Sequence, residues 1–188
     1  MSSEYAVRHS VNIGYHNSVD RGRRVPRKTG KREVLQLLSV IEQAYDHRSW
    51  HGTNLRGSIR QVSAGQAKWR PAPARHNIWE IVVHAAYWKY AVWRRLAGAR
   101  RGSFPLKGSN WFRRPQDTSP EAWRSDVALL DHMHRSLRAA VAKLSASELH
   151  RTPRGRSVSN FALLSGIAAH DLYHAGQIQL LKKLSRRP

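Results

Sequence analysis

The chain has 188 residues, no cysteine and a formal net charge of +21 at neutral pH. Without cysteine it has no disulfides, no thiolate nucleophile and no thiolate metal ligand, so histidine, aspartate and glutamate are the remaining metal-ligating side chains. The length suits one domain with its own core. No apolar run approaches the ~20 residues of a membrane span, and residues 1–20 lack the layout of a secretory signal, so we expect a cytoplasmic protein with no membrane contact.

Residues 1–30 are polar, rich in arginine and without apolar periodicity. This composition predicts a flexible basic extension in front of a domain that spans residues 31–188. Other basic clusters lie at 99–101, 113–114, 151–156 and 182–187. These are mostly ends and connections, whereas nucleic-acid binding needs charge focused on one face. We therefore do not expect a nucleic-acid partner.

Helical spacing begins at residue 31. The first apolar stripe consists of Val34, Leu37, Leu38, Ile41 and Tyr45, and Trp50, Leu55 and Ile59 extend it beyond a break near Gly52. The stretch PAPARHN (71–77) ends this region, and a second helix is predicted from there to about Leu96. Residues 98–118 are rich in glycine, proline and serine and are predicted to be a connection.

The third helix has a clear start at Thr118-Ser119-Pro120-Glu121, which supplies a cap, a proline in the first turn and an acidic residue. The fourth is predicted over about 158–184, with Leu163, Ile167, His170, His174, Ile178 and Leu181 on one face. No segment has the two-residue alternation of a strand. The pattern predicts an all-α four-helix bundle. Because 98–118 is long enough to return along a helix, we expect up-down-down-up order.

Two histidines interrupt the apolar face of the fourth helix. His170 and His174 are four residues apart, so both side chains project from the same face. In the second helix, His84 interrupts a stripe that includes Ile81 and Trp88. Three buried imidazoles without partners would be unfavourable, and one metal ion satisfies a nitrogen of each. Three histidine ligands leave a coordination position open, as in reactive sites.

Four further residues are candidates near this site. Glu80 lies one turn before His84, where it could orient that ring, act as a base or stabilise the helix start. His51 lies in a break and is a second candidate for the pocket. Gln177 lies close to His174 and is expected to hydrogen-bond there. His134 is on the core seam of the third helix, where it is either a hydrogen-bonded core residue or a fourth ligand.

Three stretches of the sequence resemble the DinB-like superfamily of metal-binding helical bundles. They are WRPAPARHNIWEIVVHAAYWKYAVWRRLAG, GSFPLKGSNW and GIAAHDLYHAGQIQLLKK, and the resemblance covers about residues 32–185. It implies an up-down-down-up bundle, often a homodimer, that holds nickel or zinc through His84, His170 and His174. It also implies relatives that are thiol transferases, isomerases or hydrolases, some of which act with a low-molecular-weight thiol.

Taken together, these observations favour a metal-dependent transferase or hydrolase that acts on a small-molecule substrate. A metal lowers the pKa of a bound thiol or water and so supplies the nucleophile that a chain without cysteine lacks. The alternative is a non-catalytic, metal-stabilised binding module whose basic extension contacts nucleic acid or an acidic partner. A polar group such as Glu80 beside an open site would favour chemistry, whereas a site sealed by aromatic rings would favour a structural metal.

Overall fold

The secondary structure is helical. A computed structural model describes residues 27–153 and 157–186, and within these ranges it contains helices and no strand. The predicted all-α class is therefore confirmed. The helices are α1 (Arg27–Tyr45), α2 (Leu55–Ser58), α3 (Ala64–Lys68), α4 (Ile78–Ala97), α5 (Pro120–Val141), α6 (Ala146–His150) and α7 (Asn160–Leu184).

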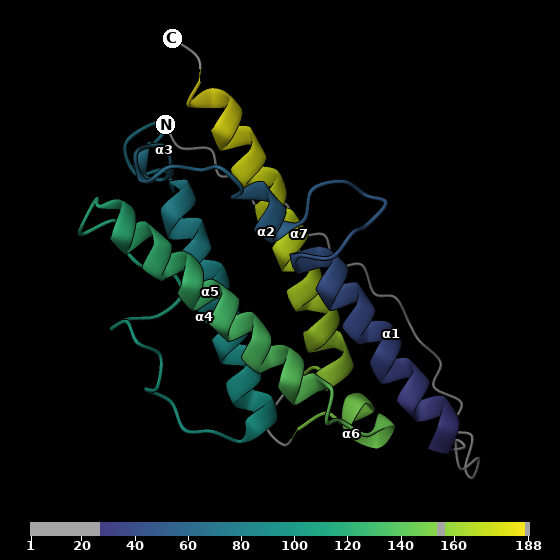
Figure 1. Cartoon of the computed structure of the whole chain (residues 1–188). Helices are drawn as coiled ribbons and strands as arrows, with labels where there is room; N and C mark the ends of the chain where they lie inside the picture. Colours follow the sequence, from purple (N-terminus) through teal and green to yellow (C-terminus); the bar gives the residue numbers. More distant parts are fainter. Residues whose placement is uncertain (1–26, 154–156, 187–188) are drawn as a thin grey trace, which may run out of the picture.

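The long helices α1, α4, α5 and α7 form the body of the molecule (Figure 1). Helix α4 packs against both α5 and α7, and α1 packs against α7. The short helix α2 contacts α1 and α7, α3 contacts α4 and α5, and α6 contacts α1 and α7. Helix α4 therefore links α5 to the pair formed by α1 and α7.

The core consists of two apolar clusters. One joins the last residues of α1 and α7 to the first turns of α4 and α5, with Tyr45, Trp79, Trp123 and Ile178 among its members. The other joins most of α1, from Val34 to Ala44, and the first turns of α7 to the last turns of α4 and α5, with Val92, Leu137 and Leu164 also among its members. Each end of the body thus has its own core.

Caps fix where the long helices begin. Asn77 accepts a hydrogen bond from the Glu80 backbone, and the Glu80 side chain accepts one from the Asn77 backbone, so α4 starts with a capping box. Helix α4 ends at Gly98, whose φ of 65° is left-handed and favours glycine. Helix α5 starts as its sequence predicted, with Ser119 as the cap and proline in the first turn.

The connection between α4 and α5 runs back along α4 (Figure 1). Ser103 hydrogen-bonds to Tyr90 near the end of α4, and the Arg114 carbonyl accepts from Asn77 at its start. Residues later in the connection therefore contact residues earlier in the helix. This path carries the connection past the middle of α4, where His84 lies.

Some sequence predictions were wrong in detail. Helix α1 begins at Arg27, so the last four residues of the predicted extension are helical; the rest of the extension, residues 1–26, lies outside the described residues. Trp50 does not extend the first stripe, because 96% of it is exposed. In α7, Leu164 is buried more fully than the predicted Leu163. The short helices α2, α3 and α6 were not predicted, since segments of four or five residues are too short to show a periodicity.

Membrane spans are absent from the described part of the chain. None of its helices combines the length and the apolar character that crossing a bilayer requires.

Candidate metal centre

Three imidazoles from α4 and α7 meet at one point. Nε2 of His170 lies 3.1 Å from Nε2 of His84 and 3.1 Å from Nε2 of His174. One ring nitrogen from each of the three lies within 4.8 Å of the others, so the group could hold a metal ion. The two helices pack directly against each other, which brings residues 86 positions apart into contact.

The outer nitrogens of two of these rings are fixed by oxygen acceptors. Nδ1 of His84 lies 2.9 Å from the backbone carbonyl of Asn110, and Nδ1 of His174 lies 2.7 Å from Oε1 of Gln177. A carbonyl oxygen accepts and does not donate, so both Nδ1 atoms carry the proton. The Nε2 atoms of His84 and His174 then carry no proton, and their lone pairs face His170.

These protonation states fit a cation between the rings. Neutral His170 has one ring proton, so it can donate from Nε2 to one neighbour only. If the proton of His170 is on Nδ1 instead, that N–H group donates to no acceptor, because the buried Nδ1 atom has no hydrogen-bond partner among the described residues. Either way, at least one of the two short contacts joins nitrogens without a proton that both can share. A tetrahedral ion with bonds of about 2.0–2.1 Å would place its nitrogens roughly 3.3 Å apart, close to the observed 3.1 Å.

Burial keeps the three rings neutral at physiological pH. Burial is the largest cause and nearby histidines a smaller one, and together they bring the pKa of His84 to about 4, against a rise from the Asn110 carbonyl, and the pKa of His170 to about 3. The pKa of His174 is also lowered, again chiefly by burial. A histidine binds metal only as the neutral imidazole, so the rings are in the form that metal binding needs.

Aromatic residues enclose the His84 side of the site. Trp111 stacks on His84 at a centroid distance of 3.8 Å and on His76 at 3.6 Å, with all planes within 10° of parallel. Since two rings cannot occupy the same face, Trp111 lies between the two histidines. By contrast His170 is only half-buried. Solvent therefore reaches this residue of the group, while Trp111 covers the opposite side.

Asn110 contacts the candidate site and was not identified from the sequence. Its backbone carbonyl orients His84, and its side-chain oxygen accepts from the Trp88 indole at 2.9 Å. Its φ of 63° is left-handed, a conformation that asparagine tolerates better than most residues. The available signal was its position in the stretch GSNW, two residues after Gly108 and directly before Trp111. That stretch indicates a turn but does not reveal which helix the turn contacts.

Glu80 does not orient His84, contrary to one of its predicted roles. Its carboxylate binds Arg70 through two hydrogen bonds of 2.7 and 2.9 Å and also contacts Nδ1 of His76 at 3.0 Å. Burial alone would raise the pKa of Glu80, but hydrogen bonds from Arg70 and His76 outweigh it and lower that pKa. The carboxylate is an anchor for the start of α4, and the Asn110 carbonyl takes the orienting role.

The remaining candidates lie in different places. Gln177 makes the expected hydrogen bond to His174 and also donates to the Tyr173 hydroxyl. His134 is buried and stacks on Tyr45 at 3.7 Å, and its Nδ1 has no hydrogen bond. His51 is exposed in the turn before α2. Neither His134 nor His51 belongs to the histidine group that could hold an ion.

A buried ion pair, also missed from the sequence, joins the same two helices. Lys89 of α4 donates to Asp171 of α7, and both side chains are almost completely buried. The Lys89 ammonium also lies 4.7 Å from the centre of the Tyr45 ring. Removing one partner of a buried pair leaves an uncompensated charge. The pair therefore fixes α7 against α4 next to His170.

The family comparison agrees with this architecture. Residues 47–178 match the model of the DinB superfamily. No curated protein and no solved structure matches the chain. The match covers more than half of the 188 residues and includes His84, His170 and His174. The chain belongs to the DinB superfamily.

Proposed function

We propose that this protein binds one divalent metal ion, nickel or zinc, through His84, His170 and His174, and uses it as a metal-dependent transferase or hydrolase. The proposal rests on the convergence of three Nε2 atoms on one point between α4 and α7. Two of these nitrogens are unprotonated and present a lone pair. Family membership supports it, because DinB-like proteins are metal-binding bundles.

The chain itself would position and shield the reaction. Asn110 and Gln177 hold two of the imidazoles by their outer nitrogens, which fixes ring orientation and tautomer. Trp111 excludes water from the His84 side. A bound divalent ion would supply Lewis acidity at the position that three histidines leave open, lowering the pKa of a thiol or of water. A low-molecular-weight thiol is the proposed cosubstrate of the transferase form.

The up-down-down-up order and a homodimer belong to the same proposal. The two apolar clusters support the order, since one gathers the starts of α4 and α5 with the ends of α1 and α7. The non-catalytic alternative is favoured by two observations, since Trp111 stacks on His84 and Glu80 pairs with Arg70 away from the site. Half-buried His170 leaves the site open on its own side, which favours chemistry. Most of the basic extension, residues 1–26, lies outside the described residues.

The metal site is tested by replacing its ligands. We expect His84→Ala and His170→Ala to lose most of the zinc or nickel bound by the wild type, because three ligands leave no redundancy. His132→Ala is the matched control, since this histidine is exposed on α5, and it should bind metal normally. Metal is measured by mass spectrometry after gel filtration, and circular dichroism verifies folding. Full metal content in both ligand variants would contradict the site.

The same preparations separate an enzyme from a metal-stabilised scaffold. The metal-loaded protein is screened with glutathione and a haloaromatic electrophile for thiol transfer, and with activated esters for hydrolysis. An enzyme should lose turnover on chelation and regain it with zinc or nickel. A scaffold would show no turnover under any condition, while chelation would still lower its melting temperature.

A further inference from the structure

Two consecutive residues of α7 each bury a polar atom that has no hydrogen bond. In the ranges 27–153 and 157–186, the buried side-chain atoms without a partner are Nδ1 of His134, Nδ1 of His170 and Oδ1 of Asp171. Buried polar groups in folded proteins almost always have a partner, so each exception calls for an explanation. The two atoms of α7 are complementary, because an imidazole nitrogen can carry a proton and a carboxylate oxygen can accept a hydrogen bond.

The other two imidazoles of the candidate site show what His170 lacks. Nδ1 of His84 donates to the Asn110 carbonyl, and Nδ1 of His174 donates to the side chain of Gln177. A metal-binding histidine usually has such an acceptor, because the hydrogen bond fixes the tautomer and the orientation of the ring. When Nε2 of His170 binds a metal ion, the ring proton is on Nδ1. Within the described part of the chain, this is the one proton of the three without an acceptor.

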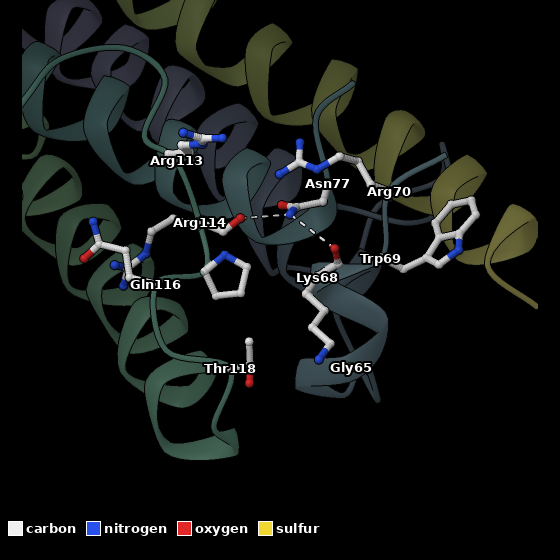
Figure 2. A pocket seen from close by; sticks show the side chains of 10 residues that line it. Gly65, Lys68, Trp69, Arg70, Asn77, Arg113, Arg114, Gln116 and Thr118 are labelled. Carbon is white, nitrogen blue, oxygen red and sulfur yellow. Dashed lines mark hydrogen bonds between the residues drawn. The ribbon is translucent and has the colours of Figure 1, made fainter. Parts of the chain in front are cut away.

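Both acceptors that the site already has are themselves held in place. The Asn110 carbonyl belongs to the connection between α4 and α5. Asn77 ties that connection to the start of α4, because its side-chain amide donates to the Arg114 carbonyl at 2.9 Å (Figure 2). Gln177 donates to the Tyr173 hydroxyl at 2.9 Å. We therefore expect the acceptor of the third imidazole to be an oxygen that the fold also fixes.

The Asp171 carboxylate meets this requirement. Lys89 of α4 donates to its Oδ2 atom, and both side chains are almost completely buried. His170 points toward α4, where it meets His84. Asp171 points toward the same helix, where it meets Lys89. After burial and the neighbouring histidines, the charge of Lys89 also lowers the pKa of His170, so the ion pair lies close to this ring.

We propose that Asp171 positions His170 through one buried water molecule, which accepts the Nδ1 proton of His170 and donates to Oδ1 of Asp171. A buried water molecule usually makes about three hydrogen bonds, and an N–H group of Lys89 supplies the third. The bridge places a carboxylate behind the third imidazole, an arrangement that raises the basicity of a metal-binding histidine. The inference rests on the proposed metal site and adds a residue that supports one of its ligands.

The test separates the acceptor from the ion pair. Truncating Asp171 alone would leave Lys89 as an uncompensated buried charge and would destabilise the protein. Two double variants avoid this problem. The acceptor-retaining variant, Lys89→Met/Asp171→Asn, removes the ion pair but keeps a side-chain oxygen at position 171. The acceptor-free variant, Lys89→Met/Asp171→Leu, removes both, and leucine has the branched shape of aspartate. Because the two variants differ at one side chain only, their difference reports on the acceptor.

The zinc dissociation constant of each full-length protein is measured by competition with a chromophoric chelator. We expect it to rise about 10- to 100-fold over the wild type in the acceptor-free variant, the usual cost of losing such a partner. In the acceptor-retaining variant it should rise by less than about threefold, because the amide oxygen still accepts a hydrogen bond. Circular dichroism verifies that both variants fold.

NMR spectra of the zinc-loaded, nitrogen-15-labelled proteins observe the three imidazole Nδ1–H groups directly. The His170 proton should shift upfield in the acceptor-free variant, because it loses its acceptor, while those of His84 and His174 keep their positions. The positioning role is overturned if the two variants bind zinc equally well or if the His170 proton does not shift, and the metal site then stands. A wild type that binds no zinc overturns the metal site and the positioning role together.

Discussion

At the scale of single residues, Gly30 shows how a close contact decides an identity. It is buried in α1, and a Cβ added there would lie 2.5 Å from Cβ of Ala146 in α6. Such a distance is too short for two carbon atoms, so α6 or α1 would have to move. The glycine is therefore required by packing and not by backbone conformation.

This contact leads to a prediction about two glycines. Gly30→Ala should lower the free energy of unfolding, although alanine favours a helix by about 1 kcal/mol over glycine. Gly166→Ala is the matched control in α7, where an added Cβ would meet nothing within 4 Å. It should raise stability by about 0.5–1 kcal/mol. Urea unfolding measures both changes, and equal stabilisation of the two variants would show that α6 does not pack on Gly30.

At the scale of elements, α7 carries two of the three histidines and depends on a cap at its start. Ser159 accepts a hydrogen bond from the Ala162 backbone, which satisfies one of the free N–H groups of the first turn. His170 lies eleven positions beyond Ser159, or about three turns, too far for the cap to affect the ring directly.

We therefore expect Ser159→Ala to lower stability by about 1 kcal/mol and to leave the metal content unchanged. The matched control is Ser165→Ala, within the same helix, where no capping bond is lost. Its effect should be smaller, since alanine also favours the helix interior. Thermal unfolding and metal analysis are measured on the same samples. A loss of metal in Ser159→Ala would mean that the first turn controls the site.

At the scale of the whole molecule, burial of neutral histidines makes stability depend on pH. Burial, and to a smaller extent the positive charge of Lys89, lower the pKa of His134 to about 3. An unfolded histidine has a pKa of about 6.5. Between these values the unfolded chain binds a proton that the folded chain does not. The stabilisation from His134 is thus fully present above about pH 6.5 and is lost as the pH falls toward 3.

The variant His134→Leu should flatten this dependence between pH 6 and pH 4. One proton changes the slope by at most about 1.4 kcal/mol per pH unit. The difference in slope between variant and wild type isolates His134 from the other buried groups, and metal-free protein avoids competition between protons and metal. His132→Leu is the control on the same helix, with an exposed side chain, and it should keep the wild-type slope. Parallel curves for His134→Leu and the wild type would contradict burial of a neutral ring.

The sequence by itself determined the helical class and the three histidines of the candidate metal site. Apolar spacing of three to four residues and caps such as Ser119 are local properties of a sequence. For this reason α4, α5 and α7 could be placed from the amino-acid sequence. His170 and His174 share a face because of helix geometry alone. His84 was identified because a histidine interrupted an apolar stripe, and the three rings do converge.

The tertiary structure alone decided what surrounds those rings. Asn110 orients His84 because the connection folds back along α4, and no local pattern encodes which turn of a loop meets which turn of a helix. Glu80 has the right spacing to reach His84, yet its carboxylate goes to Arg70, because a nearby guanidinium offers a buried acid a stronger partner. Helix periodicity fixes the direction of a side chain, whereas long-range packing selects its partner.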